Sequence, residues 1–595
     1  MKTSTSRLAS KLAAGATAML LALTACGGSS STPEGAAGGN DSVSVAMTTP
    51  TWILPISQPG KTQGENAIFI DALYPPVFAF EFGGEHELGL DTERSMAEDV
   101  EVSEEGRTYT VTLKDLTWSD GEPITARDVE FWYNLVKHNK EDWASYTEGG
   151  FPDNVESFEV TDDTTFTVTT TETFAPGWFV GNQLNALTAI PQHAWDKTSA
   201  DGEIGDHDRD EKGAQEVFDL LITAAEDPAA YDSNELWDVV SGPWTLEDFT
   251  PGGEVKLAAN ETYAGENAPK LSEVVFKPFT DDNSQFNVLR SGGIDYGYIP
   301  AGALDQQKVI EDAGYTVEPW HGWSITYLAL NFANPETGKF FDQKYIRQAM
   351  QQLIDQESIS EVVWNGTAAP TCGPVPQEPG AAGTMDGCAY QFDPDAAIAL
   401  LESHGWEVTP DGASSCVNPG TGDDQCGEGI EKGDTLSFTM TSQSGFTATS
   451  RMMAEIQSQF AQAGIDLEIQ EVPDSVAVSQ ACQEGQECTW DMSFFGSQGS
   501  WYYPVYASGE RLFATGAPVN LGLYSDEKAD ELINATKFSS DPQALEEYND
   551  YLAEDLPVLW MPNPVNRVSA FSEDIEGISP QDPMLGMHPE DWSRG

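Results

Sequence analysis

Aromatic residues form the group of side chains best suited to binding a ligand. Trp501, Tyr502, Tyr503 and Tyr506 crowd into one short segment. A buried ring of this kind covers about 150–250 Å² while its polar end can still hydrogen-bond, which suits extended peptides or sugars. A single aromatic residue in a loop is often packed beneath it, but a cluster this dense is harder to bury completely. We therefore predict an aromatic ligand platform at these positions.

Two polar residues and one distant pair complete the predicted binding set. Ser497 and Gln498 lie just before the aromatic run, and Trp52 with Ile53 lies near the start of the folded chain. The predicted ligand-binding residues are Trp52, Ile53, Ser497, Gln498, Trp501, Tyr502, Tyr503 and Tyr506.

An acidic run is the feature most similar to a metal site. Asp206, Asp208 and Asp210 alternate with other residues, as carboxylates do in a calcium-binding loop. The pattern then departs, because Glu211 stands in place of the turn glycine and Val217 in place of the bidentate glutamate. We interpret the run as a solvated acidic loop and predict no bound metal and no cofactor, while a calcium site here stays open.

The cysteines favour an exported, disulfide-bonded protein. Besides Cys26, the chain has six cysteines in close-spaced pairs: Cys372 with Cys388, Cys416 with Cys426, and Cys482 with Cys488. Several connectivities are open, but neighbour pairing is the simplest in loops rich in glycine and proline. No C-x-x-C is present and no histidine stands near these cysteines, which argues against zinc. We predict three local disulfides.

Catalytic motifs are absent from the sequence. There is no G-x-S-x-G, no H-E-x-x-H and no P-loop, and the seven histidines are scattered. Triads need not be local in sequence, so this absence alone is weak evidence. Together with the features below, it predicts a binding protein without catalytic residues rather than an enzyme.

The N-terminus is typical of a bacterial lipoprotein. Lys2, Arg7 and Lys11 precede a short apolar stretch over residues 12–25, as in a secretory signal peptide. This stretch ends in L-T-A-C, which resembles a lipobox, so Cys26 is the predicted lipidation site. Residues 27–42 are rich in glycine and serine and are predicted to be a flexible tether. No later segment approaches the roughly 20 apolar residues that a spanning helix needs.

Charge excludes one class of partner. The chain carries 28 Lys+Arg against 97 Asp+Glu, a formal net charge of −69. Nucleic-acid phosphates would be repelled by such a surface, so we exclude nucleic-acid binding. The acidity is read either as a solubilising surface or as a field that steers cationic and zwitterionic solutes, although salt screens that field beyond about 8 Å.

The elements that position these residues alternate between strands and helices. Tyr109, Val111 and Leu113 recur with a period of two, which predicts a strand in a hairpin turned near Gly106. Thr125 and Asp128 form a capping box at the start of a helix. The buried face of that helix is predicted to carry Val129, Trp132, Tyr133 and Val136. Further strand–helix–strand patterns predict two α/β lobes with an added subdomain.

An ordered series of short motifs gives the chain a family resemblance. The series is A-E at 97–98, D-G-E-P at 120–123, T-A at 125–126, S-G-P-W at 241–244, R-S-G-G-I-D at 290–295, L-N-F at 330–332, I-R-Q-A at 346–349 and E-D-L-P at 554–557. This order resembles the family 5 extracellular solute-binding proteins, the receptors of peptide, nickel and oligosaccharide ABC importers. The resemblance extends over roughly residues 43–571.

The resemblance implies a two-lobed periplasmic-binding-protein type II fold whose first lobe carries the added subdomain. Lobe one would comprise residues 43–90, 235–320 and 559–595, the subdomain 91–234, and lobe two 321–558, after a signal peptide over 1–26. The chain would cross near 319–325 and return near 557–564, which makes a hinge. The implied protein is a monomer at the outer face of the cytoplasmic membrane or in the periplasm, held by its lipid anchor, and works with a permease and its ATPase subunits.

The ligand is where the sequence departs from the family. Peptide receptors carry an aspartate after the apolar strand that corresponds to residues 490–495, and it captures the free amine of the peptide. Here the next residues are G-S-Q-G-S-W-Y-Y-P, without that aspartate. We expect oligopeptides first, because the resemblance to peptide receptors is greatest and the acidic field still attracts amines. The alternative is an oligosaccharide, since related sugar receptors use stacking on tryptophan.

Overall fold

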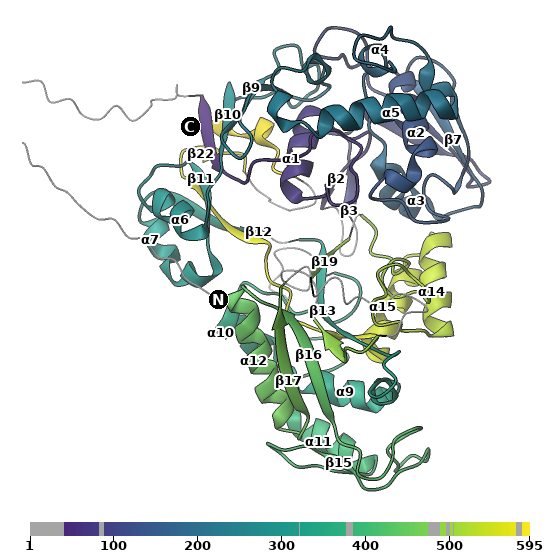
Figure 1. Ribbon diagram of the computed structural model, residues 1–595, viewed down its shortest axis with the longest axis vertical. Coiled ribbons are helices and arrows are strands. Elements are labelled where there is room, and N and C mark those ends of the chain that lie inside the picture. Colours follow the sequence, from purple (N-terminus) through teal and green to yellow (C-terminus); the bar gives the residue numbers. More distant parts are fainter. Residues whose placement is uncertain are drawn as a thin grey trace, which may run out of the picture. The chain divides into compact units, whose positions relative to one another are not determined.

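Two large β-sheets form the framework of the fold (Figure 1). The computed structural model describes residues 41–82, 88–320, 322–376, 385–473, 476, 488–494, 500–503, 505–578 and 586–595. The predicted signal peptide, most of the tether, Cys26, Cys482, Ser497 and Gln498 lie outside these ranges. Among the described helices, none is both long enough and apolar enough to cross a bilayer.

The first sheet has the strand order β12-β21-β11-β1-β10-β9-β8. Its central strand β1 pairs in parallel with β10 and β11, and the other pairs are antiparallel. The strands are β1 (Ser42–Ala46), β8 (Trp244–Phe249), β9 (Val255–Ala259), β10 (Glu273–Lys277), β11 (Tyr296–Ile299), β12 (Tyr315–Trp320) and β21 (Arg567–Ser572). Helices α1 (Gly64–Leu73), α6 (Asp282–Arg290) and α7 (Gln307–Glu311) accompany them.

The second sheet is built around β13 (Ser324–Leu330), whose residues are almost all buried. It has the order β17-β16-β18-β13-β19, and β20 also pairs with β13. The other strands are β16 (Ser437–Gln443), β17 (Asp466–Val472), β18 (Met492–Ser493), β19 (Ser500–Tyr502) and β20 (Val558–Trp560). Its helices are α8 (Gly338–Phe341), α9 (Lys344–Gln352), α10 (Gln356–Trp364), α11 (Pro394–Ser403), α12 (Thr447–Ala461), α14 (Glu527–Phe538) and α15 (Gln543–Asp555).

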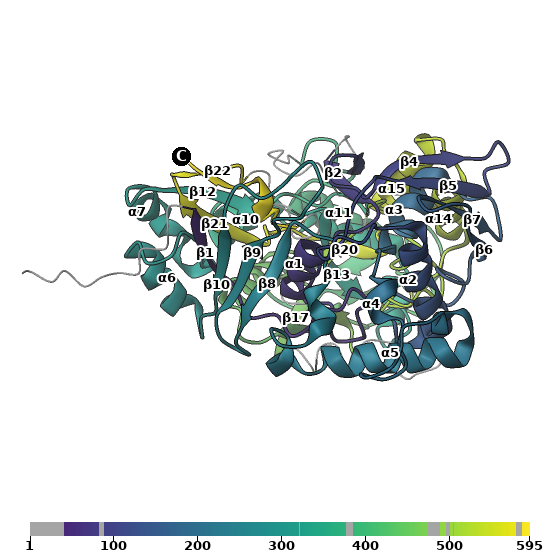
Figure 2. The same ribbon diagram turned by 90° about the horizontal axis from the view of Figure 1, so that it is seen from above.

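The added subdomain contains a four-stranded sheet, β4-β5-β7-β6, with α2 and α5 on one side (Figure 2). Its elements are β4 (Ala97–Val102), β5 (Thr108–Leu113), β6 (Val155–Val160), β7 (Thr165–Thr170), α2 (Ala126–His138), α3 (Pro176–Asn182), α4 (Gln192–Trp195) and α5 (Glu211–Ala225). Short two-stranded ribbons complete the fold: β2 (Ala79–Phe82) with β3 (Leu88–Asp91), β14 (Trp406–Glu407) with β15 (Ser415–Cys416), and β22 (Ile575–Glu576) with β23 (Ser593–Arg594).

Local patterns in the subdomain are confirmed. The hairpin of β4 and β5 forms, and Tyr109, Val111 and Leu113 are buried. The Asp128 carboxylate accepts a hydrogen bond from the Thr125 amide at 2.8 Å, and the Thr125 side chain accepts one from the Asp128 amide, which gives the predicted capping box. The predicted inner face of α2 is buried as well.

Two chain segments link the sheets, from β12 to β13 and from β20 to β21. Asn563, on the second link, binds the first residues of β13: its Oδ1 accepts from Thr326 Oγ1 at 2.8 Å, and its Nδ2 donates to the Ser324 carbonyl at 3.1 Å. The Asn566 amide donates to the Trp320 carbonyl at 2.9 Å. The two links are therefore tied to each other by hydrogen bonds.

Two predicted disulfides are present in the structure. Cys372 pairs with Cys388 and Cys416 with Cys426, with Cα–Cα distances of 5.1 and 6.1 Å. Cys488 is also disulfide-bonded, while its predicted partner Cys482 lies outside the described residues.

Gly242 packs so closely on the end of α1 that a side chain would not fit. The Ser241 and Gly242 amides both donate to the Leu73 carbonyl, and a Cβ at Gly242 would lie 2.2 Å from the Ala72 oxygen. We expect Gly242→Ala to lower the free energy of unfolding by about 1–3 kcal/mol, because backbone must move. Urea denaturation measures this. In the control Gly302→Ala, a Cβ meets nothing within 4 Å, and equal midpoints for the two variants would contradict the packing argument.

Candidate ligand-binding site

Pairing between β13 and β19 positions the aromatic segment. Ser324, Ile325 and Thr326 lie opposite Tyr502, Trp501 and Ser500 in an antiparallel register. The Ser500 hydroxyl lies 2.7 Å from the Thr326 hydroxyl, which in turn bonds Asn563 of the chain link. The predicted platform is thus attached to the links between the two sheets.

The platform residues fall into two groups. Trp501, Tyr502 and Tyr506 are partly buried, whereas Tyr503 is only 1% exposed. The guanidinium carbon of Arg511 lies 5.5 Å from the centre of the Trp501 ring. Burial lowers the pKa of Arg511, because the charged form is desolvated. Asn566 donates to the Tyr502 hydroxyl at 3.4 Å.

Three of the predicted ligand contacts are core residues in this structure. Trp52 and Ile53 have no exposed surface, and the Trp52 indole donates to the Ile56 carbonyl at 3.3 Å. Tyr503 belongs to the core cluster of the second lobe, where burial raises its pKa well above the ordinary value. This corrects the expectation that Trp52, Ile53 and Tyr503 present open surface to a ligand, since apolar packing encloses all three side chains.

A cavity of about 700 Å³ opens beside Tyr506. Its walls come from three regions: α3 with the preceding Ala175, the loop closed by the disulfide between Cys372 and Cys388, and α15. Asp386, Glu546 and Asp550 contribute carboxylates to its lining. No lysine, arginine or histidine is among the described residues that line it. The cavity therefore favours a ligand with positive charge.

Helix α3 connects the subdomain to the segment that follows β19. The Trp178 indole donates to Ser508 Oγ at 3.0 Å, and the Asn182 side chain bonds both the amide and the carbonyl of Tyr506. Phe174 stacks on Phe538 at the end of α14, with 5.3 Å between ring centres. These contacts hold α3 against the segment around Tyr506, which also lines the cavity.

Sequence reasoning missed several of the lining residues. Trp178, Asp386, Glu546 and Asp550 lie far apart in the chain and match no local motif. One signal was available for α15, because Glu546, Asn549 and Asp550 share a polar helix face at spacings of three and four.

The centre of the acidic run is buried and has a structural role. Asp208 is completely buried and accepts a bidentate interaction from Arg127 and a 2.7 Å hydrogen bond from Asn134. Asp210 caps α5 by accepting from the Gly213 amide at 3.0 Å. The prediction of a solvated loop is therefore wrong for Asp208. The carboxylates of Asp196, Asp206 and Asp208 lie close enough to share an ion, but the Arg127 guanidinium already contacts all three.

Comparisons with known proteins agree on one family. Residues 92–518 match the model of the bacterial extracellular solute-binding proteins, family 5. The oligopeptide-binding protein AppA of Bacillus subtilis is 25% identical over 511 residues, which cover 82% of this chain and 81% of AppA. The glutathione-binding protein GsiB of Salmonella paratyphi A is 24% identical over 514 residues, which cover 82% of this chain and 85% of GsiB.

Solved structures agree on the fold. The structure of Bacillus subtilis AppA in complex with a nonapeptide has a TM-score of 0.63 at 21% identity and covers 93% of this chain and 99% of its own. NikZ from Campylobacter jejuni in complex with Ni(L-His) has a TM-score of 0.64 at 18% identity, with coverage of 93% and 99%. The fold is the two-lobed type II fold of periplasmic binding proteins with an added subdomain in lobe one, as predicted.

The Arg127 cluster provides a stability test. We expect Arg127→Gln to lower the free energy of unfolding by about 3 kcal/mol, because it leaves buried carboxylates without their counter-charge. Chemical denaturation measures the loss. The control is Lys212→Gln, which removes an equal charge from an exposed pair on α5 and should change little. A loss no larger than the control's would refute the assigned role of Arg127.

Proposed function

Since the chain belongs to the bacterial extracellular solute-binding proteins of family 5, we propose that it captures oligopeptides between its lobes and delivers them to the permease of an ABC importer. Such a receptor binds its solute without catalysis, and ATPase subunits on the other side of the membrane supply the energy. We keep the lobe boundaries expected from the sequence as part of this proposal.

The acidic cavity beside Tyr506 is the observation that favours a peptide. A peptide with a free N-terminus carries an ammonium group, and Asp386, Glu546 and Asp550 surround the cavity with negative charge. Its volume of about 700 Å³ lies within the range of about 300–1,000 Å³ that is usual for small-molecule pockets. These carboxylates supply the negative charge for the peptide amine. In peptide receptors that charge comes from the aspartate that is absent here after residues 490–495.

Aromatic residues give the ligand its apolar contacts in this proposal. Trp178 and Tyr506 line the cavity, and Trp501 and Tyr502 lie partly buried on the adjoining strand. We retain Trp501, Tyr502 and Tyr506 as ligand contacts, together with Ser497 and Gln498. The rings also support the alternative, an oligosaccharide, because sugar faces stack on tryptophan and tyrosine. Lobe closure follows if the ligand binds the closed form better than the open one.

We further infer that Cys26 carries the lipid anchor and that the folded part lies outside the cytoplasm. The L-T-A-C motif supports acylation, and the glycine- and serine-rich residues after it would separate the folded part from the membrane surface. Two or more acyl chains hold a protein durably, at roughly 0.8 kcal/mol for each buried methylene group. Neighbour pairing makes Cys482 the proposed partner of Cys488.

The ligand class is tested by thermal shift with short peptides, their N-acetylated forms, and gluco-, xylo- and manno-oligosaccharides. Peptides with a free amine are expected to raise the melting temperature, since ligand at about 100 times its dissociation constant adds roughly 2.7 kcal/mol. Acetylation and Asp550→Asn should each weaken binding about tenfold or more. Acetylation removes the positive charge of the peptide amine, and Asp550→Asn removes a negative charge of the cavity.

One control and one further variant sharpen this test. Glu554→Gln changes the same helix at an exposed position that does not line the cavity, so it should bind as wild type does. Trp501→Ala should weaken binding while the unliganded melting temperature holds; a loss of stability instead would make Trp501 a core residue. A response to sugars alone would favour the alternative, and equal binding of free and acetylated peptides would refute the role of the carboxylates.

The anchor is tested by fractionation of cells that express the full chain. Wild-type protein is expected in the membrane fraction and Cys26→Ala in the soluble extracellular or periplasmic fraction, because acylation requires the thiol. Recovery of both proteins in the same fraction would contradict the lipoprotein assignment.

A further inference from the structure

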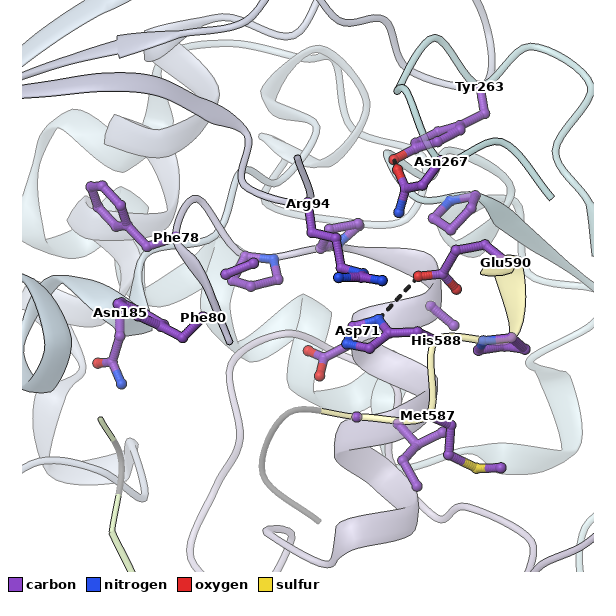
Figure 3. A pocket seen from close by; sticks show the side chains of 18 of the residues that line it. Asp71, Phe78, Phe80, Arg94, Asn185, Tyr263, Asn267, Met587, His588 and Glu590 are labelled. Carbon is purple, nitrogen blue, oxygen red and sulfur yellow. Dashed lines mark hydrogen bonds and ion pairs between the residues drawn. The ribbon is translucent and has the colours of Figure 1, made fainter. Parts of the chain in front are cut away.

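A second cavity, of about 230 Å³, lies against α1 (Figure 3). Phe78 and Phe80 from the β2 region form one side, and the C-terminal segment with Met587 and His588 forms another. Val505 also borders it. This cavity and the one beside Tyr506 share no lining residue among those that the structure describes.

The carboxylate of Asp71 is the one charge here that the described residues leave without a hydrogen-bond partner. It lies at the end of α1 and borders the cavity beside His588 (Figure 3). Burial raises the pKa of Asp71 from its ordinary 3.8 to about 6, because the desolvated charge is unfavourable; His588 offsets part of this effect, and Glu590 adds to it. Among the described residues no hydrogen bond or ion pair holds this carboxylate, and His588 is the neighbour whose positive charge offsets its own.

The other charged groups of the cavity already have partners. His588 Nδ1 and Glu590 Oε1 form an ion pair at 3.0 Å. Arg94 pairs with Asp91 and Asp591 through its two terminal nitrogens, so two carboxylates balance its charge, although its buried Nε has no hydrogen-bond partner among the described residues. The Tyr263 hydroxyl donates to Asn267 at 3.0 Å. The negative charge of Asp71 remains.

We propose that this cavity binds a small organic cation, a primary ammonium group on an apolar body. The ammonium would lie against the Asp71 carboxylate, and the body would pack on Phe78, Phe80 and Met587. The volume falls below the range of about 300–1,000 Å³ that is usual for drug-sized ligands, so the body is about as large as one aromatic side chain. An aromatic face next to the cation adds further attraction. This site does not rest on the proposed peptide function.

Calorimetry with 2-phenylethylammonium at pH 8 tests the proposal on the full folded protein. Saturable binding is expected for this amine, and none for 2-phenylethanol or 3-phenylpropanoate, which have a similar shape without the positive charge. Asp71→Asn should weaken binding at least tenfold. Glu65→Gln, which removes the same charge from α1 outside the cavity lining, should bind as wild type does.

Two further variants keep the result unambiguous. Ala79→Leu fills the cavity from β2 without changing a charge and should also abolish binding. Asp550→Asn should leave it unchanged, because Asp550 lines the other cavity. Absence of saturable binding in wild type, or binding that Asp550→Asn removes and Asp71→Asn keeps, would overturn the proposal.

The stability of Asp71→Asn gives an independent readout. The titratable or charged groups that face Asp71 are His588, Glu590, Arg94 and Tyr263. Because the folded pKa of Asp71 is raised, ionisation destabilises the fold above about pH 6 and has no effect below the ordinary value of 3.8. Without ligand, Asp71→Asn should therefore melt higher than wild type at pH 8, by a margin that vanishes towards pH 4. With saturating 2-phenylethylammonium at pH 8, wild type should melt higher than Asp71→Asn. An unchanged difference in melting temperature would count against the site.

Discussion

Pairing along β13 is the constraint on which the rest of the structure depends. Its first residues pair with β19, its middle with β20 and its end with β18. Side chains alternate along a strand, so a slip of one residue would turn every side chain of β13 to the opposite face. Such a slip would move the aromatic segment, the return link to lobe one and the second core together. The hydrogen bond that Asn563 donates to Ser324 and the one it accepts from Thr326 fix the start of this register.

The cavity beside Tyr506 depends on α3, although α3 belongs to the added subdomain. Asn182 bonds the backbone of Tyr506 on both sides, and Trp178 reaches Ser508. A ligand between these walls touches parts of the chain that belong to different cores. Binding can therefore couple to lobe movement through α3, because any rotation that separates Trp178 from α15 also opens the cavity.

Sequence patterns predicted the features that depend on residues close together in the chain. The alternation in β5, the capping box of Thr125 and Asp128, and two disulfides each involve residues close in the chain, and motif order gave the fold. The site was harder to predict, because its contacts are long-range: Trp178 and Ser508 are 330 positions apart. Composition could not tell that Trp52 and Tyr503 are buried, since an aromatic residue suits a core and a platform equally. Likewise, the acidic run gave no sign that Arg127 would neutralise Asp208.

Three arginines of this acidic chain each contact more than one carboxylate among the described residues. Arg94 contacts Asp91 and Asp591, Arg127 contacts Glu130, Asp196, Asp206 and Asp208, and Arg594 contacts Asp295 and Asp574. Substituting one exposed acid removes a single weak interaction, whereas substituting one of these arginines removes the counter-charge of two or more carboxylates at once. Tolerance to amino-acid change is therefore asymmetric: acidic positions can drift during evolution one at a time, while an arginine can be lost only after its partners have changed.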